Sequence, residues 1–195
     1  MLKLYKAVKF SKDEYEHIRD VLVPQGKKGW GDQKNKTIDI KNHISKFTLR
    51  NQKCICPYCE EILDCTRQLE HIVNKAQYGQ YTFERYNLVT SCGTCNHAKM
   101  EEDLLIGVAQ QRYKKNQFAI VHPYFDDPNK EIVYNDSDHL ELNANASSAI
   151  GKETIRILQL NSTSAVLKRY QITRRAVPTE QQLAQLYKEL EEYKR

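Results

Sequence analysis

Two pairs of cysteines are the clearest chemical feature of this 195-residue chain. Cys56 and Cys59 form one CxxC unit, and Cys92 and Cys95 form a second. A CxxC turn can aim two thiolates at one ion, so two such turns complete a tetrahedral zinc site. The sequence therefore predicts a structural Zn²⁺ whose four coordination positions are all filled by sulfur, which leaves no open position for catalysis at that ion.

Cys54 and Cys65 remain outside these pairs. Six cysteines in a chain of this length are too few for a disulfide scaffold. Cys54 lies too close to Cys56 for good chelate geometry, so we expect both leftover cysteines to be buried small apolar residues. The alternative is that one of them replaces a zinc ligand.

The segment between the cysteine pairs contains a second set of polar residues. Glu70 and His71 end an alternating apolar and polar stretch, Asn87 begins Asn-Leu-Val, and Asn96 follows Cys95 in the pattern CxxCNxxK. In this order the residues resemble the HNH endonuclease family, whose ββα core holds one divalent metal and is often stapled by a CxxC pair on each side. An isolated Glu-His pair is usually a surface accident, but here three matches fall in order within a paired CxxC frame.

The resemblance implies a role for each matching position. His71 corresponds to the first histidine, and Asn87 to the middle asparagine that bridges backbone groups and orients it. Asn96 takes the final position, which the family fills with His or Asn. Glu70 stands where the family most often has Asp, and its extra methylene group moves the carboxylate by about one bond length. The resemblance implies Glu70 and Asn96 as ligands of a catalytic metal.

The proposed chemistry requires these residue types. Phosphodiester hydrolysis needs a water molecule that loses a proton, and a neutral imidazole suits that task at pH 7, so His71 is the candidate general base. A carboxylate from Glu70 and an amide oxygen from Asn96 favour Mg²⁺ or Mn²⁺, which would neutralise charge on the scissile phosphate. Lys99, one turn after Asn96, is placed to meet a phosphate oxygen. His97 is the rival to Asn96, although neighbours on a helix point about 100° apart.

Substrate binding must come from outside this segment. Residues 54 to 109 have a net charge of −4, whereas residues 1 to 53 have a net charge of +7. The expected phosphate contacts are therefore lysines of the first loop, with a weaker set further on: Lys27, Lys28, Lys34 and Lys36, then Lys114, Lys115, Arg174 and Arg175. Trp30 in the same glycine-rich loop is placed to stack on a base or dock a partner protein, unless the loop is simply solvated.

Several elements must position these residues. Ser11 and Glu14 form a capping-box pattern that predicts a helix ending before Pro24, and a second helix is expected from Thr37 to Arg50. Short strands are expected at residues 67 to 73 and 86 to 91, followed by a helix that begins near Cys95. Further expectations are helices at residues 103 to 113, 151 to 160 and 179 to 195, and extended chain from Phe118 to Tyr134 around a turn at 125 to 129.

These elements predict an α+β fold in which a mainly helical chain surrounds a small ββα-metal nuclease core. We expect three parts: a basic helical arm at residues 1–53, the zinc-stapled core at 54–109, and a mainly helical extension at 110–195. The formal charge of +5 and the sequence pI of 8.8 suit a nucleic-acid partner. No stretch suggests a membrane span or a signal peptide, so we expect a cytoplasmic protein.

A narrower resemblance covers most of residues 37 to 172. The helix before Cys56, the segment His122-Pro-Tyr-Phe-Asp-Asp-Pro128 and the segment from Gly151 to Asn161 are similar to HNH nucleases of Septu and retron-linked bacterial antiphage systems. That resemblance implies an effector that cuts DNA, or in some members tRNA, and is controlled by a partner ATPase. The alternatives are an RNA-cleaving enzyme and a zinc-stapled module that binds nucleic acid or protein without cutting.

Overall fold

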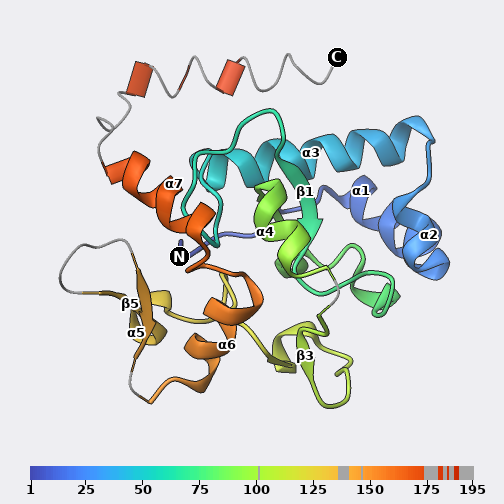
Figure 1. Cartoon of the computed structure of the whole chain (residues 1–195). Coiled ribbons are helices and arrows are strands. Elements are labelled where there is room, and N and C mark those ends of the chain that lie inside the picture. Colours follow the sequence, from blue (N-terminus) through green and yellow to red (C-terminus); the bar gives the residue numbers. More distant parts are fainter. Residues whose placement is uncertain are drawn as a thin grey trace.

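A ββα unit lies at the centre of the computed structural model, which describes residues 1–100, 102–135, 141–145, 147–173, 180, 181, 184, 187 and 188. Strand β1 (Gln68–His71) pairs antiparallel with β2 (Leu88–Ser91), and His71 lies opposite Leu88. Helix α4 (Gly93–Ala98) follows β2 and packs beside β1 (Figure 1). The two short strands and the helix expected between and after the cysteine pairs are thereby confirmed.

Helix α3 (Asn35–Asn51) supports β2 from its other side. Its buried Thr48 hydroxyl lies 2.7 Å from the hydroxyl of Thr90 on β2. Gln52, four residues after Thr48, is fully buried. Its side-chain oxygen accepts the N–H of Thr90 at 2.9 Å, and its side-chain nitrogen donates to the carbonyl of Thr90 at 2.6 Å. This amide satisfies the backbone of a strand edge that would otherwise be buried without partners. The expected helix at residues 37 to 50 is confirmed.

The N-terminal segment forms a chain of short helical pieces. Helix α1 (Lys12–His17) begins with the expected capping box between Ser11 and Glu14. A π-helical turn (Ile18–Leu22) and a 3-10 turn (Val23–Gln25) continue it, and α2 (Lys27–Trp30) follows. Gly29 of α2 is buried against the backbone of Leu22, where a side chain has no room. The expected exposed loop after Pro24 is therefore partly a helix packed on the preceding turn.

The rest of the chain adds two small hairpins and two longer helices. Strand β3 (Leu105–Ile106) pairs with β4 (Gln117–Phe118), and β5 (Ile132–Tyr134), preceded by α5 (Pro128–Glu131), pairs with β6 (Leu142–Ala144). Helices α6 (Ala149–Ile157) and α7 (Thr163–Thr173) come next. The helix expected at residues 151 to 160 is confirmed, and α7 was not anticipated.

The helix expected at residues 103 to 113 is wrong. Its apolar residues have a helical spacing, but Gly107 has a φ of 78°, which turns the chain back on itself. The preceding β3 pairs with β4 instead, and the side chain of Asp103 accepts a hydrogen bond from the N–H of Leu105 at 3.0 Å. The extended stretch expected from Phe118 to Tyr134 is interrupted by α5. The last expected helix falls almost entirely outside the described residues.

The three expected segments of the chain share one hydrophobic cluster. It joins residues such as Leu4 and Leu49 to Tyr58 and Val89 of the central segment and to Ile120 further on. A second cluster places Ile40 and Ile44 of α3 beside Leu88 and Phe83. Helices around three small two-stranded sheets agree with the expected α+β class. Within the described part of the chain, no helix has the length and apolar character to cross a membrane.

Candidate functional site

The four paired cysteines come together as the sequence predicts. Their sulfur atoms all lie within 4.8 Å of one another, and the sulfurs of Cys59 and Cys92 are 3.7 Å apart. Four tetrahedral bonds of about 2.3 Å from zinc to sulfur would place the sulfurs roughly 3.8 Å apart. Burial raises the pKa of the Cys56 thiol, and a dication among the sulfurs would reverse that preference. The cluster therefore has the ligand type and spacing of a structural zinc site.

Local backbone geometry places these ligands. Cys56 and Cys59 flank a turn closed by the hydrogen bond from Glu60 N–H to the carbonyl of Cys56, at 3.0 Å. Glu60 adopts a φ of 63°, the left-handed conformation that closes such a turn. Cys92 is the N-cap of α4, and its sulfur accepts the N–H of Cys95 at 3.5 Å. Each pair is thus fixed by residues no more than four positions apart.

The other two cysteines stay outside the cluster. Cys54 is fully buried, as expected, and burial raises the pKa of its thiol to about 11. Cys65 is exposed, so the expectation that it is buried is wrong. It lies in a polar turn where Asp64 accepts hydrogen bonds from both the backbone and the hydroxyl of Thr66, at 2.8 and 2.6 Å, which keeps this turn at the surface.

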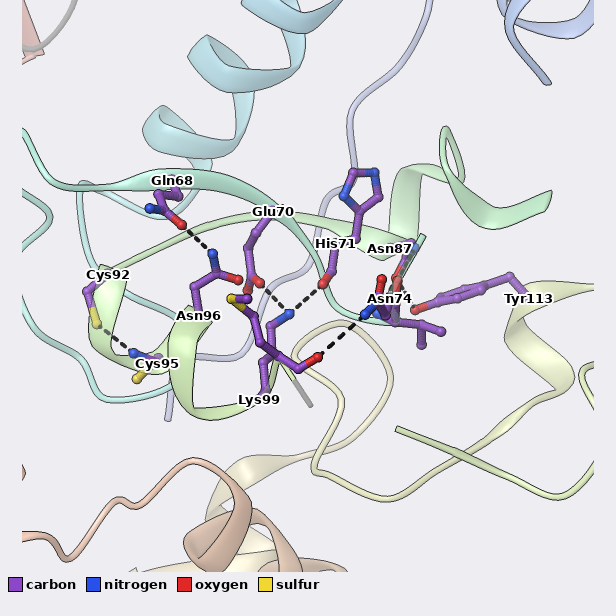
Figure 2. Close-up of polar contacts among 12 residues, drawn as sticks. Gln68, Glu70, His71, Asn74, Asn87, Cys92, Cys95, Asn96, Lys99 and Tyr113 are labelled. Carbon is purple, nitrogen blue, oxygen red and sulfur yellow. Dashed lines mark hydrogen bonds and ion pairs between the residues drawn. The ribbon is translucent and has the colours of Figure 1, made fainter. Parts of the chain in front are cut away.

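A second group of residues lines a cavity of about 510 Å³ between β1 and α4. Glu70, His71, Asn96 and Lys99 all border this cavity, so four of the predicted site residues meet at one place. Glu70 and His71 are neighbours on β1, and their side chains leave the strand in opposite directions (Figure 2). The carboxylate of Glu70 faces Asn96 and Lys99, whereas the imidazole of His71 points away from them.

Glu70 is held by Lys99 inside this group. The ammonium group of Lys99 lies 2.5 Å from Glu70 Oε2 and donates to the backbone oxygen of His71 at 2.6 Å. Burial raises the pKa of the Glu70 carboxyl, and the charge of Lys99 opposes that rise. The Lys99 side chain is only 6% exposed. The expected contact between Lys99 and a substrate phosphate does not match this position, because its ammonium group is already bound to the protein.

Asn96 lines the cavity, whereas His97, the alternative ligand, does not. The Asn96 amide nitrogen donates to Oε1 of Gln68 on β1, which leaves the amide oxygen on the side of Glu70 (Figure 2). His97, the next residue of α4, is exposed and does not line the cavity. The 100° step between helix neighbours explains the difference. Between the two candidates, the geometry favours Asn96.

The imidazole of His71 is buried and held in one tautomer. Its Nε2 lies 2.9 Å from the backbone oxygen of Thr82. A carbonyl oxygen can only accept, so Nε2 must bear the proton and Nδ1 keeps a free lone pair. Burial, aided by the nearby charge of Lys75, lowers the pKa of His71 to about 3. The ring is therefore neutral at pH 7, and its Nδ1 lone pair is a weaker base than that of an exposed imidazole.

Trp30 packs against this imidazole instead of lying free in a loop. The two ring centroids are 4.4 Å apart in an edge-to-face arrangement, and Trp30 also contacts Phe83 at 5.4 Å. The expectation that Trp30 stacks on a base or docks a partner does not match this half-buried position. Because Trp30 ends α2, its contact brings the exposed Lys27 and Lys28 of that helix close to the His71 side of the site.

The other lysines expected to bind phosphate have varied surroundings. Lys34 and Lys36 are exposed, but the ammonium of Lys36 already lies 2.7 Å from Asp13. The side chain of Lys114 lies over the ring of Tyr86, 4.3 Å from its centroid. Arg174 and Arg175 fall outside the described residues. These positions leave Lys27, Lys28 and Lys34 as the candidates of the first loop.

Asn87 occupies the buried position that the resemblance implies. Its side-chain oxygen accepts the N–H of Val73 at 2.7 Å and the hydroxyl of Tyr113 at 2.9 Å. Its nitrogen donates to the carbonyls of Val73 and Tyr81, at 3.1 and 3.0 Å. This one amide ties the chain leaving His71 to the segment that precedes β2. It makes four protein hydrogen bonds, so it has no free atom for a metal.

Lys75, which was not among the predicted site residues, also lines the cavity. Lys75 follows His71 by four positions and lines the cavity half-buried. Burial, and the nearby charge of Lys99, lower the pKa of its ammonium group. A cation placed in this way gains stability from an anion in the cavity. Its position four residues beyond the end of β1 could have drawn attention to it, but only the fold shows that its side chain lines the cavity.

The oxygen atoms of this cavity fit a divalent cation in type. Both carboxylate oxygens of Glu70 are buried without a hydrogen-bond donor in good geometry, although Lys99 supplies an ion pair. The amide oxygen of Asn96 faces the same place. Buried carboxylate and amide oxygens are the ligands that Mg²⁺ and Mn²⁺ prefer.

A comparison with protein-family models finds no matching family, and a comparison with curated proteins finds no significant match.

Proposed function

We propose that this protein is a metal-dependent endonuclease of the HNH type that hydrolyses phosphodiester bonds. The observation that supports it best is the grouping of Glu70, His71 and Asn96 around one cavity of a ββα unit. Beside that cavity, the buried cysteine cluster fixes the turn at residues 56–59 and the N-terminus of α4. The proposal thus rests on residues up to 26 positions apart that converge through the fold.

Each residue has a chemical role in this proposal. His71 accepts a proton from the attacking water at Nδ1, while the Thr82 carbonyl holds the Nε2 proton and fixes the tautomer. Asn87 positions the chain that follows His71. Glu70 and Asn96 would hold Mg²⁺ or Mn²⁺, which stabilises charge on the phosphate and on the leaving oxygen when bound. A phosphate in the cavity would also offset the charge of Lys75 and raise the pKa of His71 toward the neutral range.

A cleavage assay tests the enzyme. Supercoiled plasmid is incubated with the wild-type protein and Mg²⁺ or Mn²⁺, beside His71→Ala and the matched control His97→Ala. We expect His71→Ala to lower the rate by about 10²- to 10⁴-fold, as removal of a general base does. His97→Ala changes a histidine that is exposed and outside the cavity, so it should leave the rate unchanged. Failure of the wild type to cut DNA or RNA with any divalent metal would overturn the proposal.

A non-catalytic zinc-stapled binding module is the second candidate. Two observations favour it: Lys99 already neutralises Glu70, and His71 is only 5% exposed beneath Trp30. Such a module would bind nucleic acid or protein without consuming it. Wild-type protein that binds nucleic acid, keeps its zinc and cuts nothing would select this candidate.

The substrate and biological role belong to the same proposal. We propose DNA as the substrate, with low sequence specificity, and RNA such as tRNA as the alternative, because the one-metal mechanism does not use a 2′-hydroxyl group. Similarity of the flanking segments to nucleases of antiphage systems supports a role as a defence effector controlled by a partner ATPase. Parallel assays on plasmid, single strands and total tRNA identify the substrate. Copurification with an ATPase encoded beside it, and phage plating with and without His71→Ala, test the role.

A further inference from the structure

A second cavity lies away from the predicted site residues. It has a volume of about 550 Å³ and is lined by residues of the N-terminal segment and by the chain before β2, among them Lys9, Phe10, Lys12, Tyr15, Phe83 and Arg85. We name it the basic groove. None of these residues belongs to the predicted site, so the groove needs an explanation of its own.

The cations of the basic groove lack acidic partners. Among the described residues, no carboxylate forms an ion pair with Lys9, Lys12 or Arg85. Glu84 is the one acidic residue in the lining, and its carboxylate accepts the backbone N–H of Tyr86 at 3.2 Å. The lining therefore holds three cations against one carboxylate, and this excess of positive charge attracts anions.

Positive charge continues beyond the groove through Arg85. Its guanidinium lies over the ring of Tyr86, 4.8 Å from the centroid, and the ammonium of Lys114 lies 4.3 Å from the same centroid. Two cations against one ring repel each other, and an anion between or above them would remove that repulsion. Lys114 is also without a carboxylate partner in the described part of the chain. The positive track thus extends past the groove itself.

Aromatic side chains accompany these cations. Tyr15 is 56% exposed, and Phe10 is half-buried in the same lining. Aromatic rings next to cations are the two features of proteins that bind single-stranded nucleic acid, since bases stack on the rings and phosphates meet the charges. A duplex keeps its bases stacked inside the helix, so the rings would gain little from it.

The groove is also joined to the proposed catalytic site. Phe83 lines the groove and packs against Trp30, which contacts His71. The residue before Phe83 is Thr82, whose carbonyl accepts the hydrogen bond from Nε2–H of His71. The groove therefore adjoins the imidazole of His71 through Phe83 and Trp30.

We infer that the basic groove binds a single-stranded segment of nucleic acid and leads it to the catalytic site. Lys9, Lys12 and Arg85 would contact phosphates, and Tyr15 would stack on a base. This inference rests on the proposed nuclease function for its purpose, but the binding can be measured without cleavage.

The test uses zinc-loaded, full-length His71→Ala protein, so that the probe stays intact. Fluorescence anisotropy follows binding to labelled single-stranded DNA, to single-stranded RNA of the same sequence, and to the corresponding blunt duplex. Lys9→Gln with Lys12→Gln should weaken single-strand binding about tenfold and reduce the slope of log K against log salt by about 1.4. Tyr15→Ala should weaken it roughly tenfold as well, through the lost stacking.

Matched controls lie outside the groove. Lys6→Gln and Tyr5→Ala change an exposed lysine and a tyrosine that is 86% exposed, neither of which lines it, and both should bind as His71→Ala alone does. Tighter binding of either single strand than of the duplex, lost in the groove variants only, supports the inference. Unchanged affinity in the groove variants, or equal binding of the duplex, overturns it. If the wild-type protein cuts DNA and the groove variants bind normally, the inference about the groove is wrong and the proposed nuclease function stands. Groove-dependent binding without cleavage refutes only the nuclease.

Discussion

The cysteine cluster and the cavity lined by Glu70 and Asn96 are built in different ways, although they share α4. In the cluster, each ligand pair is fixed by a turn of four residues, and the sulfurs lie within 4.8 Å of one another. In the cavity, Glu70 comes from a strand and Asn96 from a helix, and long-range contacts through Lys99, Gln68 and Thr82 hold the side chains. Because its ligands are placed by local turns, we expect the cysteine cluster to stabilise the fold. The side chains of the cavity are held by tertiary contacts, so we expect that they can be changed without loss of the cluster.

The largest effect is expected from loss of the zinc site at the cysteine cluster. Cys59→Ser, or removal of zinc with a strong chelator, should unfold the core and abolish cleavage together. A structural zinc is worth about 10 to 16 kcal/mol in zinc-finger peptides, which rivals the whole stability of a typical domain. Circular dichroism, thermal melting and zinc content measured on the same samples check this.

Cys65→Ser is the matched control for the staple. Cys65 is an exposed cysteine outside the cluster, so the variant should keep one equivalent of zinc and the wild-type melting curve. A Cys59→Ser protein that melts like the wild type would show that the cluster does not staple the fold.

A double-mutant cycle at Glu70 and Lys99 tests whether the cavity is separable. Glu70→Gln leaves the buried ammonium of Lys99 unpaired, which should cost about 3 to 5 kcal/mol of stability and abolish cleavage. Adding Lys99→Met removes that stranded charge and should recover at least half of the lost stability without recovering cleavage. Urea unfolding and plasmid cleavage are measured on all four proteins.

The opposite outcome of this cycle is equally clear. If the double variant stays as unstable as Glu70→Gln, the ion pair is not the source of the cost. If it cuts plasmid normally, Glu70 is not a ligand for the catalytic metal. Zinc content should remain unchanged throughout, since neither residue belongs to the cysteine cluster.

The buried histidines predict how stability depends on pH. Burial lowers the pKa of both His71 and His122 to about 3, compared with about 6.5 in an unfolded chain. Between these values the unfolded state binds more protons, so stability is complete above about pH 6.5 and falls as the pH drops toward 3. Each histidine contributes a slope of up to about 1.4 kcal/mol per pH unit.

Urea unfolding from pH 7.5 to 5 measures this slope, and zinc content is followed at each pH because thiolates bind metal less tightly as the pH falls. His122→Asn should reduce the slope by about half, because one of the two buried imidazoles is then absent. A slope equal to that of the wild type would contradict the neutral, buried state of His122.

The sequence could predict the cluster and much of the central fold. CxxC spacing alone fixes the ligand pairs, and the alternating and helical patterns located β1, β2, α3 and α4. The capping box at Ser11 was also confirmed. These features depend on residues close together in the chain, so local chemistry is enough to specify them.

The sequence could not predict contacts made across the fold. Nothing near Lys99 indicates that its ammonium turns inward to Glu70, and nothing near Trp30 indicates that it covers His71. The apolar residues of segment 103 to 113 have a helical spacing. The chain nevertheless turns at Gly107, and β3 pairs with β4. Side-chain direction at each of these places depends on segments far away in the sequence.

The smallest expected effect concerns the contact between Tyr113 and Asn87. The Tyr113 hydroxyl donates to Asn87 Oδ1 at 2.9 Å and lies 3.2 Å from Nε2 of His122. Tyr113→Phe removes this hydroxyl and keeps the buried ring, so it should cost about 1 kcal/mol of stability. Asn87 would keep its three hydrogen bonds to Val73 and Tyr81, so cleavage should fall only a few-fold.

Asn87→Ala is the comparison that gives this result meaning. It removes all four hydrogen bonds of the Asn87 side chain, two of which hold Val73 in the chain that follows His71. It should therefore lower cleavage far more than Tyr113→Phe while the zinc content stays constant. Single-turnover cleavage rates and zinc content are measured for both variants. If Asn87→Ala cut as fast as the wild type, the orientation of His71 would depend on Thr82 and Trp30 alone, and the cavity would be held together by fewer long-range contacts than its geometry indicates.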